Sequence, residues 1–584
     1  MTDLADYELQ SIPLGHLPVV AEYVHRLGIH ATIDEVLPMD RRMKVSDAEC
    51  VTLMILNILQ GRCGLYHMGP WAEGTDSEIL IGEGIDPMRL SDTRLAHALD
   101  RIFTYGPDNV LSEVVVKYLQ GDTAPSEYCV HQDTTTLKLY GEYDRGYQPQ
   151  EPVPRRGYNK DHRPDLKQLV YGLSLHGAVG IPLCVSTLDG NTSDHEANRL
   201  HIDRLAGLLP PADDVTLVAD CKLVDPDTLG RLIDAAFHFI SLLPRTYGLH
   251  ARVVDLALEY EELPELVREK GRKKADPDHV YRGMSFREPF EILDPETKTK
   301  RKQELRFLAV QSDHLAEKFE ASLPGRLAKD RKYIEKTMEK LGKSTFACQS
   351  DAEKAFLDGL REPKLHRVDV AVVPVEVRER RARRGRPAKG EEPPATETRY
   401  QLLVQAIEVD KAAVAYARSH GKFFVLVTDH LGCTRWPDTR VLGEYRHQRM
   451  IEGQTGFRWL KGPAAAAPMF LNTPSRIAAL GLVFVLALMV RNYIEFVIRD
   501  QLATFPKATT LPNMDGRPIK KPSAENVFWL FRSMGEVAVR RGGVLIERRL
   551  SGLDDDTRLA LQALQVPVAV FTTPRKRSGA GPRS

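Results

Sequence analysis

The hydrophobic period changes near residue 127, and this change divides the chain into parts of different fold class. Between residues 12 and 120, apolar residues recur at i, i+3 and i+4, as in "DAECVTLMILNILQG" and "SDTRLAHALDRIFTYG". Serine or aspartate stands near the start of these stretches, which is typical of helix N-termini. From residue 127 the apolar residues alternate with period two, which predicts strands. The sequence therefore predicts an all-α N-terminal domain followed by an α/β fold.

The α/β part begins with strands and then alternates between helices and strands. Two short apolar runs, "QLVYGLSLHG" (168–177) and "IPLCVSTLDG" (181–190), meet at Gly-Ala-Val-Gly, which predicts a hairpin. The stretch 193–209 has a serine cap, early acids and helical spacing. Buried strands are predicted at 214–223 and 237–245, with a helix between them. This order is typical of a mixed α/β layer.

Composition shifts divide the rest of the chain. Residues 246–420 are rich in charge and interrupt the α/β pattern, so we interpret them as an insertion that is largely β. The longest apolar run, Ile477–Val490, is about fourteen residues, which is short for a membrane span and favours a buried core helix. The predicted parts are a helical N-terminal domain (1–120), the first part of the core (121–245), the insertion (246–420), the second part of the core (421–505), and a C-terminal helical region with a basic tail (506–584).

Two aspartates have parallel settings in the core. Asp133 and Asp220 each follow an apolar strand, in "YCVHQD" and "VTLVAD". Aspartate is a poor strand residue, so each is either a turn or cap residue or is held there for chemistry. Neighbouring strands that end in carboxylates would bring their oxygens within reach of one hard cation such as Mg²⁺. Glu452, in the helical stretch 442–462, is the candidate third acid.

Four strings together resemble the DDE transposases of bacterial insertion sequences, in the group numbered four and its subgroup sixteen-thirty-four. The strings are "HQDTTTLKLYGEY", "GYNKDHRPDLKQLVYGLSL", "LDGNTSDHEANRL" and "YRHQRMIEGQTGFRWLKGP", and the resemblance covers about residues 120–500. It implies an RNase H-like core with a β-rich insertion, preceded by a helical domain that is a candidate for binding DNA ends (1–120). It also implies two Mg²⁺ ions, for which Mn²⁺ can substitute. The implied reaction is hydrolysis at the element's ends, followed by attack of the freed 3′-hydroxyl on target DNA.

The resemblance assigns Asp133, Asp220 and Glu452 as the catalytic, metal-binding acids. The family's Y-x₂-R-x₃-E-x₆-K signature matches here only in part. Tyr445 stands seven residues before Glu452, as the signature requires, whereas Gln448 occupies the arginine position and Arg449 follows it. The resemblance therefore implies that Tyr445 and Arg449 are auxiliary or phosphate-binding residues.

The signature lysine is displaced. Trp459 stands where lysine is expected, and the nearest lysine is Lys461, nine residues after Glu452. On an unbroken helix, nine residues would turn Lys461 to the face opposite Glu452. We therefore expect the helix to be irregular between Gly453 and Gly456, which would let Lys461 serve as a phosphate contact.

A basic segment lies within the predicted insertion. Residues 376–390 carry seven basic and two acidic side chains, although the whole chain has 80 of each. Arg384 and Arg386, in Arg-Gly-Arg-Pro, are candidates for insertion into an A·T-rich minor groove. A solvated basic linker is an equally good interpretation.

The sequence thus favours a transposase that acts on double-stranded DNA as a dimer or larger oligomer, without a membrane partner. Two alternatives stay open: an RNase H-like nuclease without strand transfer, and an inactive DNA-binding derivative. The seven cysteines are scattered and contain no C-x-x-C pair, which favours a reducing compartment. The first ten residues are acidic and lack an apolar signal region. We therefore expect the protein in the cytoplasm, at the bacterial nucleoid.

Overall fold

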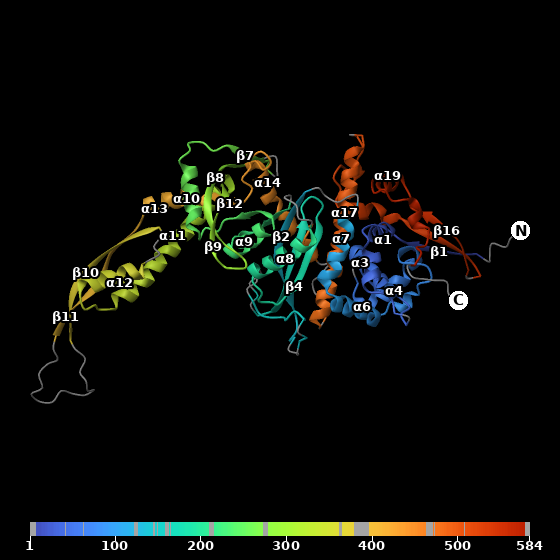
Figure 1. The fold of residues 1–584 in the computed structure, drawn as a ribbon, viewed down its shortest axis with the longest axis horizontal. Coiled ribbons are helices and arrows are strands. Elements are labelled where there is room, and N and C mark those ends of the chain that lie inside the picture. The colour runs from blue at the N-terminus through green and yellow to red at the C-terminus, as the bar shows by residue number, and fades with distance from the viewer. Residues whose placement is uncertain are drawn as a thin grey trace, which may run out of the picture.

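The computed structural model describes most of the 584-residue chain. The described residues are 7–577, apart from 41, 62, 122–126, 144–146, 149, 158–162, 164, 210–214, 272–277, 361–364, 379–395, 463–470, 472, 507 and 543. The molecule is elongated, and β1 (Tyr7–Pro13) near the start of the described chain lies close to β16 (Val544–Ser551) near its end, at one end of the long axis (Figure 1).

A large mixed sheet forms the centre of the molecule. Its strands are β2 (Tyr128–Leu139), β3 (Lys167–His176), β4 (Ile181–Leu188), β5 (Val215–Ala219), β6 (His238–Leu242), β7 (Glu265–Glu269), β8 (His279–Leu293), β9 (Lys300–Ser312) and β12 (Phe423–Thr428). The nine strands lie in the order β4-β3-β2-β5-β6-β12-β9-β8-β7. β2, β5 and β6 are parallel, and the strands on either side of them are antiparallel. Every residue of β5 is buried, as expected for a central parallel strand.

Side-chain caps fix the helices that follow these strands. α8 (Asp194–Leu208) begins after Ser193, whose side chain accepts the Glu196 N–H. α9 (Pro226–Asp234) begins after Asp225, which caps it in the same way, and α10 (Gly248–Leu258) follows β6. The hairpin of β3 and β4 and the helix at 193–209 confirm the sequence predictions for this region.

The interval 246–420 was expected to be largely β, and this expectation is corrected, since the interval contains long helices as well as strands. β8 and β9 extend the central sheet, and α11 (Asp313–Gly342), α12 (Gln349–Gly359), β10 (His366–Arg378) and β11 (Thr396–Val409) project from it as an arm (Figure 1). Buried Ile334 and Met338 of α11 pack beneath the β10–β11 hairpin against Leu402. α13 (Lys411–Gly421) leads back from the arm to β12.

A long buried helix joins the sheet to the helical body. α17 (Pro474–Thr504) contacts β4 on one side and α3, α6 and α7 on the other. It is long and apolar enough to cross a membrane, but its most apolar 18-residue window is 100% buried inside the protein. The prediction of a buried core helix is confirmed, although the helix is longer than the apolar run that indicated it.

The two ends of the chain form one helical body with two small sheets, β1-β15-β16 and β13-β14. Its helices are α1 (Leu17–Arg26), α2 (Ile29–Val36), α3 (Asp47–Gln60), α4 (Met68–Glu73), α5 (Ser77–Leu80), α6 (Asp92–Tyr105), α7 (Pro107–Leu119), α18 (Ala524–Leu530) and α19 (Asp555–Ala563). Its strands are β1 (Tyr7–Pro13), β13 (Leu511–Pro512), β14 (Pro518–Ile519), β15 (Gly535–Arg541) and β16 (Val544–Ser551).

β1 corrects the expectation of an all-α N-terminal part. It pairs antiparallel with β15, so the first described residues belong to a sheet built mainly from the C-terminal region. The short pattern of β1 does not predict a strand by itself. The strand that stabilises it lies more than five hundred residues away in the chain.

Candidate active site

One pocket brings together most of the predicted site residues. It has a volume of about 400 Å³ and opens beside the carboxyl ends of β5 and β6. The predicted residues that line it are Asp133, Asp220, Tyr445, Arg449 and Glu452. The other lining residues are Leu242, Tyr281, Ser312, His314, Leu315, Phe424, Arg446 and Gln448.

Asp133 lies in the middle of β2 and not at the end of a strand, which corrects the sequence interpretation. β2 continues to Leu139 because it pairs with β3 from Val130 to Leu139. The parallel pairing with β5, however, ends at His131 opposite Val218. Asp133 stands two residues after His131, and Asp220 stands two residues after Val218. If the same register continues, these two aspartates lie side by side. Neighbouring strands lie about 4.8 Å apart, which puts the two side chains within reach of a shared cation.

Asp220 directly follows β5 and is both a cap residue and a pocket residue. Its Oδ1 accepts the Lys222 N–H at 2.9 Å and thereby caps a 3₁₀ turn, Cys221–Leu223. Its backbone carbonyl accepts the Ser241 hydroxyl from β6 at 2.7 Å. Asp220 can therefore cap this turn and also belong to the site.

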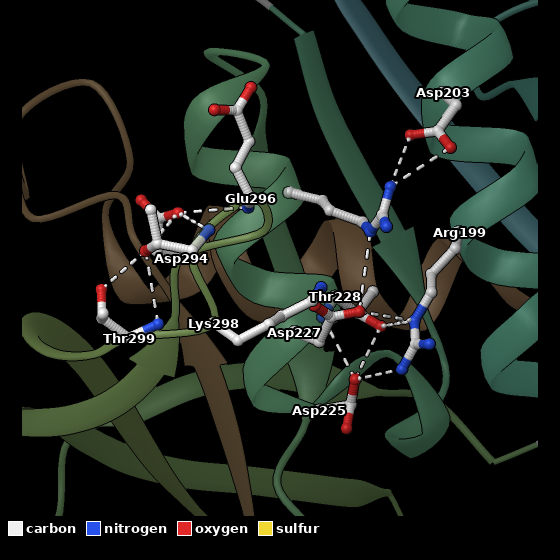
Figure 2. A network of polar contacts seen from close by, with 11 residues as sticks. Arg199, Asp203, Asp225, Asp227, Thr228, Asp294, Glu296, Lys298 and Thr299 are labelled. Atoms are coloured by element: carbon white, nitrogen blue, oxygen red, sulfur yellow. Dashed lines mark hydrogen bonds and ion pairs between the residues drawn. The ribbon is translucent and has the colours of Figure 1, made fainter.

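An ion-pair network holds the chain just after Asp220 (Figure 2). Arg199 of α8 contacts Asp225 at 2.9 Å and Asp227 at 3.2 Å. Lys298, from the β8–β9 turn, contacts Asp227 from another side at 2.5 Å. These contacts attach the start of α9, which closely follows Asp220, to two other elements: α8 and the β8–β9 turn.

Glu452 is the last residue of a short helix that ends at the predicted break. α14 (Asp438–His447) is followed by α15 (Arg449–Glu452) and α16 (Phe457–Leu460), with a turn over residues 453–456. The prediction of an irregular helix between Gly453 and Gly456 is confirmed. A Cβ at Gly456 would lie 2.1 Å from the Ile451 carbonyl oxygen, so only glycine permits this close approach.

The break buries one side of α16 but does not bring Lys461 into the pocket lining. Phe457 and Leu460 are buried, as expected from an interrupted helix. Lys461 is exposed and is absent from the residues that line the pocket. Arg384 and Arg386 lie outside the described residues.

Among the pocket residues that were not predicted from the sequence, Tyr281, His314 and Arg446 carry an aromatic or charged group. The Arg446 guanidinium lies 4.5 Å from the centre of the Tyr281 ring and is ion-paired with Glu269. Arg446 stands next to Tyr445 in the quoted "YRHQRM", which was the available signal. Tyr281 and His314 belong to β8 and α11, and their place at the pocket depends on the pairing of β8 and β9 with the central sheet.

The pocket combines negative and positive charge. Burial raises the pKa of Tyr445, and the negative charge of Asp220 adds to the rise, so this phenol stays protonated at neutral pH. Burial lowers the pKa of Arg446, as does the neighbouring Arg449. Three carboxylates in one pocket fit a hard divalent cation, because Mg²⁺ prefers oxygen ligands and retains waters. Arginines beside them are suited to binding phosphate oxygens.

Comparisons with known proteins give little direct information. A family model described as a domain of unknown function (DUF4277) matches residues 9–116, which end before β2. No curated protein matches the chain. A solved structure, the cryo-EM structure of a piggyBac transposase synaptic complex with hairpin DNA, aligns over 87% of this chain and 90% of that chain, with 8% identity and a TM-score of 0.29. A likeness this low carries no argument about fold or function.

Proposed function

We propose that the protein is a DNA transposase that uses Asp133, Asp220 and Glu452 for phosphoryl transfer. The observation that carries this proposal is that three carboxylates, from β2, the end of β5 and α15, line one pocket together with two arginines. The strand order β4-β3-β2-β5-β6, antiparallel and then parallel, supports an RNase H-like core. The four strings that resemble DDE transposases fall in the same part of the chain.

The chain's own residues would perform two tasks in this reaction. The three carboxylates would hold Mg²⁺, and a pair of such ions would activate a water or 3′-hydroxyl and stabilise the leaving oxygen. Arg446 and Arg449 would position the scissile phosphate of double-stranded DNA. Because synapsis joins two element ends, we expect a dimer or a larger oligomer on DNA. We also expect the protein to work in the cytoplasm, where bacterial DNA lies.

A cleavage and strand-transfer assay tests the proposal. The purified chain would be incubated with Mg²⁺, a plasmid carrying the DNA that flanks its gene on both sides, and a second, target plasmid. We expect cuts at fixed positions in the flanking DNA and joined products with the target. Asp220→Asn is expected to abolish both, because it removes a cation ligand while its amide oxygen still accepts the Lys222 N–H. Cuts without joined products would favour the nuclease alternative, and binding without cuts would favour the inactive derivative.

A further inference from the structure

A second cluster of ligating side chains lies beside the acidic pocket. His131 of β2 and Glu444 and His447 of α14 each offer one ligand atom, and these atoms all lie within 4.8 Å of one another. The His131 Nε2 is 3.9 Å from a Glu444 carboxylate oxygen, and the two imidazole ring centres are 5.5 Å apart. Neither Glu444 nor His447 lines the acidic pocket, so the cluster is separate from it.

His131 is the unusual member of this cluster. Its side chain is 0% exposed, and neither ring nitrogen has a hydrogen-bond partner. A buried imidazole without partners is costly, because both of its nitrogens lose their hydrogen bonds to water. Gly177 leaves space at this ring, since a Cβ there would lie 2.7 Å from the His131 Nε2. The side chain is therefore buried where its ring nitrogens find no hydrogen-bond partner, but where Glu444 and His447 offer two further ligand atoms.

We propose that His131, Glu444 and His447 bind a zinc ion that fastens α14 to β2. Two imidazoles and one carboxylate form a common protein ligand set for zinc, with water in the fourth position. Donors around a tetrahedral zinc lie roughly 3.3 Å apart, so the cluster has to contract by only about 1.5 Å. Half-buried Glu444 and exposed His447 have the freedom to do this by side-chain rotation.

The helix geometry favours the same site. Glu444 and His447 are three residues apart on α14 and therefore share one face of it. His447 is the last residue of α14, where the partial negative charge of the helix end favours a cation. α14 also carries Tyr445 and leads directly into α15 with Glu452, whereas β2 carries Asp133. The zinc would thus hold two elements of the acidic pocket in register, and this inference does not depend on the proposed reaction.

Zinc binding to the full chain tests the proposal. After dialysis against a chelator, the protein would be titrated with zinc chloride by calorimetry, and retained zinc would be measured by elemental analysis. We expect one tightly held zinc per chain and a higher melting temperature with zinc. His447→Ala and Glu444→Gln should each weaken zinc binding by about tenfold or more, since loss of a direct ligand costs no less than loss of a supporting contact.

Two control variants separate this site from other zinc sites. His67→Ala removes another exposed histidine, and Asp220→Asn removes a ligand of the acidic pocket; both should retain zinc. His447 is exposed, so its variant is expected to fold, which melting without zinc would verify. Unchanged zinc affinity in His447→Ala and Glu444→Gln would overturn the proposal. Loss of zinc in Asp220→Asn alone would do the same, because it would assign the ion to the carboxylates.

Discussion

Asp133 stands in the middle of a strand, where an acidic side chain is poorly suited to the fold. Its Oδ1 accepts the N–H of Thr134 at 2.7 Å, an interaction that an asparagine oxygen would preserve. Its position beside Asp220 concentrates negative charge, and removing one of several clustered carboxylates relieves repulsion. A carboxylate at this position is therefore needed for the proposed chemistry but not for stability. A substitution by asparagine can distinguish these two roles.

We predict that Asp133→Asn or Glu452→Gln reduces cleavage to background, with the melting temperature within about 2 °C of wild type. DNA affinity should remain nearly unchanged, because the carboxylates contribute no attraction to phosphate. Cleavage assays, thermal melting and gel-shift titrations would be compared on the same preparations. A variant that melts much lower and loses DNA affinity at the same time would show that the acid is structural.

The buried Glu536 carboxyl makes the stability of the folded protein depend on pH. It is 0% exposed on β15, with the Arg548 guanidinium 3.4 Å away. Burial raises the pKa of Glu536 from 4.5 to about 8, and the neighbouring Asp76 carboxyl adds to the rise. Between these values the folded protein binds a proton that the unfolded chain has lost, so stability falls as pH rises from about 4.5 to 8.

Glu536→Gln should remove this part of the pH dependence. The variant is expected to melt higher than wild type at pH 8 and close to it at pH 5, because the amide stays neutral throughout. Thermal melts across this range provide the measurement. Glu8→Gln, on exposed β1 in the same sheet, is the matched control and should leave the pH profile unchanged. An identical profile for Glu536→Gln would mean that this carboxyl is ionised in the folded protein.

At the scale of elements, local patterns identified those helices and strands whose signals lie within a few residues. The hairpin of β3 and β4, helix α8 and the break after Glu452 were all predicted correctly from such signals. The continuation of β2 past Asp133 was not, because the pairing with β3 that extends it is a long-range interaction. For the same reason β1 and the place of His314 at the pocket could not be predicted from the sequence.

The turn after α15 requires glycine at position 456. Gly456→Ala would place a Cβ 2.1 Å from the Ile451 carbonyl oxygen, so the backbone that carries Glu452 has to move. We expect a lower melting temperature and a large loss of cleavage. Gly443→Ala in α14 meets nothing within 4 Å and should stabilise the protein by about 0.5–1 kcal/mol. Equal behaviour of the two variants would contradict the role of the turn.

Arg384 and Arg386 stand in the sequence between β10 and β11, the two strands of the arm. Replacing Arg384 and Arg386 by alanine should weaken DNA binding and reduce the slope of log affinity against log salt by about two, if each contacts a phosphate. Binding titrations at several salt concentrations would measure this slope. A slope equal to that of wild type would favour the interpretation as a solvated linker.

At the scale of the whole molecule, the two ends of the chain stabilise each other. β1 pairs with β15, and α17 lies between the N-terminal helices and the sheet that carries the acidic pocket. Two arginines of the basic tail, Arg575 and Arg577, contact the N-terminal helices. Composition could not predict this, because the acids that these arginines contact are supplied by α1 and α3.

The tail contacts allow the association of the two ends to be tested. Arg575 binds Glu22 of α1 at 3.1 Å, and Arg577 binds Glu49 of α3 at 2.6 Å. Glu49 is buried, so removing Arg577 leaves a carboxylate without its ion-pair partner, which costs about 3 kcal/mol in comparable sites. Arg577→Ala should therefore lower the melting temperature clearly, and the double variant with Arg575→Ala should lower it further. Lys576→Ala removes an exposed cation between them and should leave melting unchanged. If all these variants melt alike, the tail does not hold the two ends together, and β1 with α17 must supply the whole association.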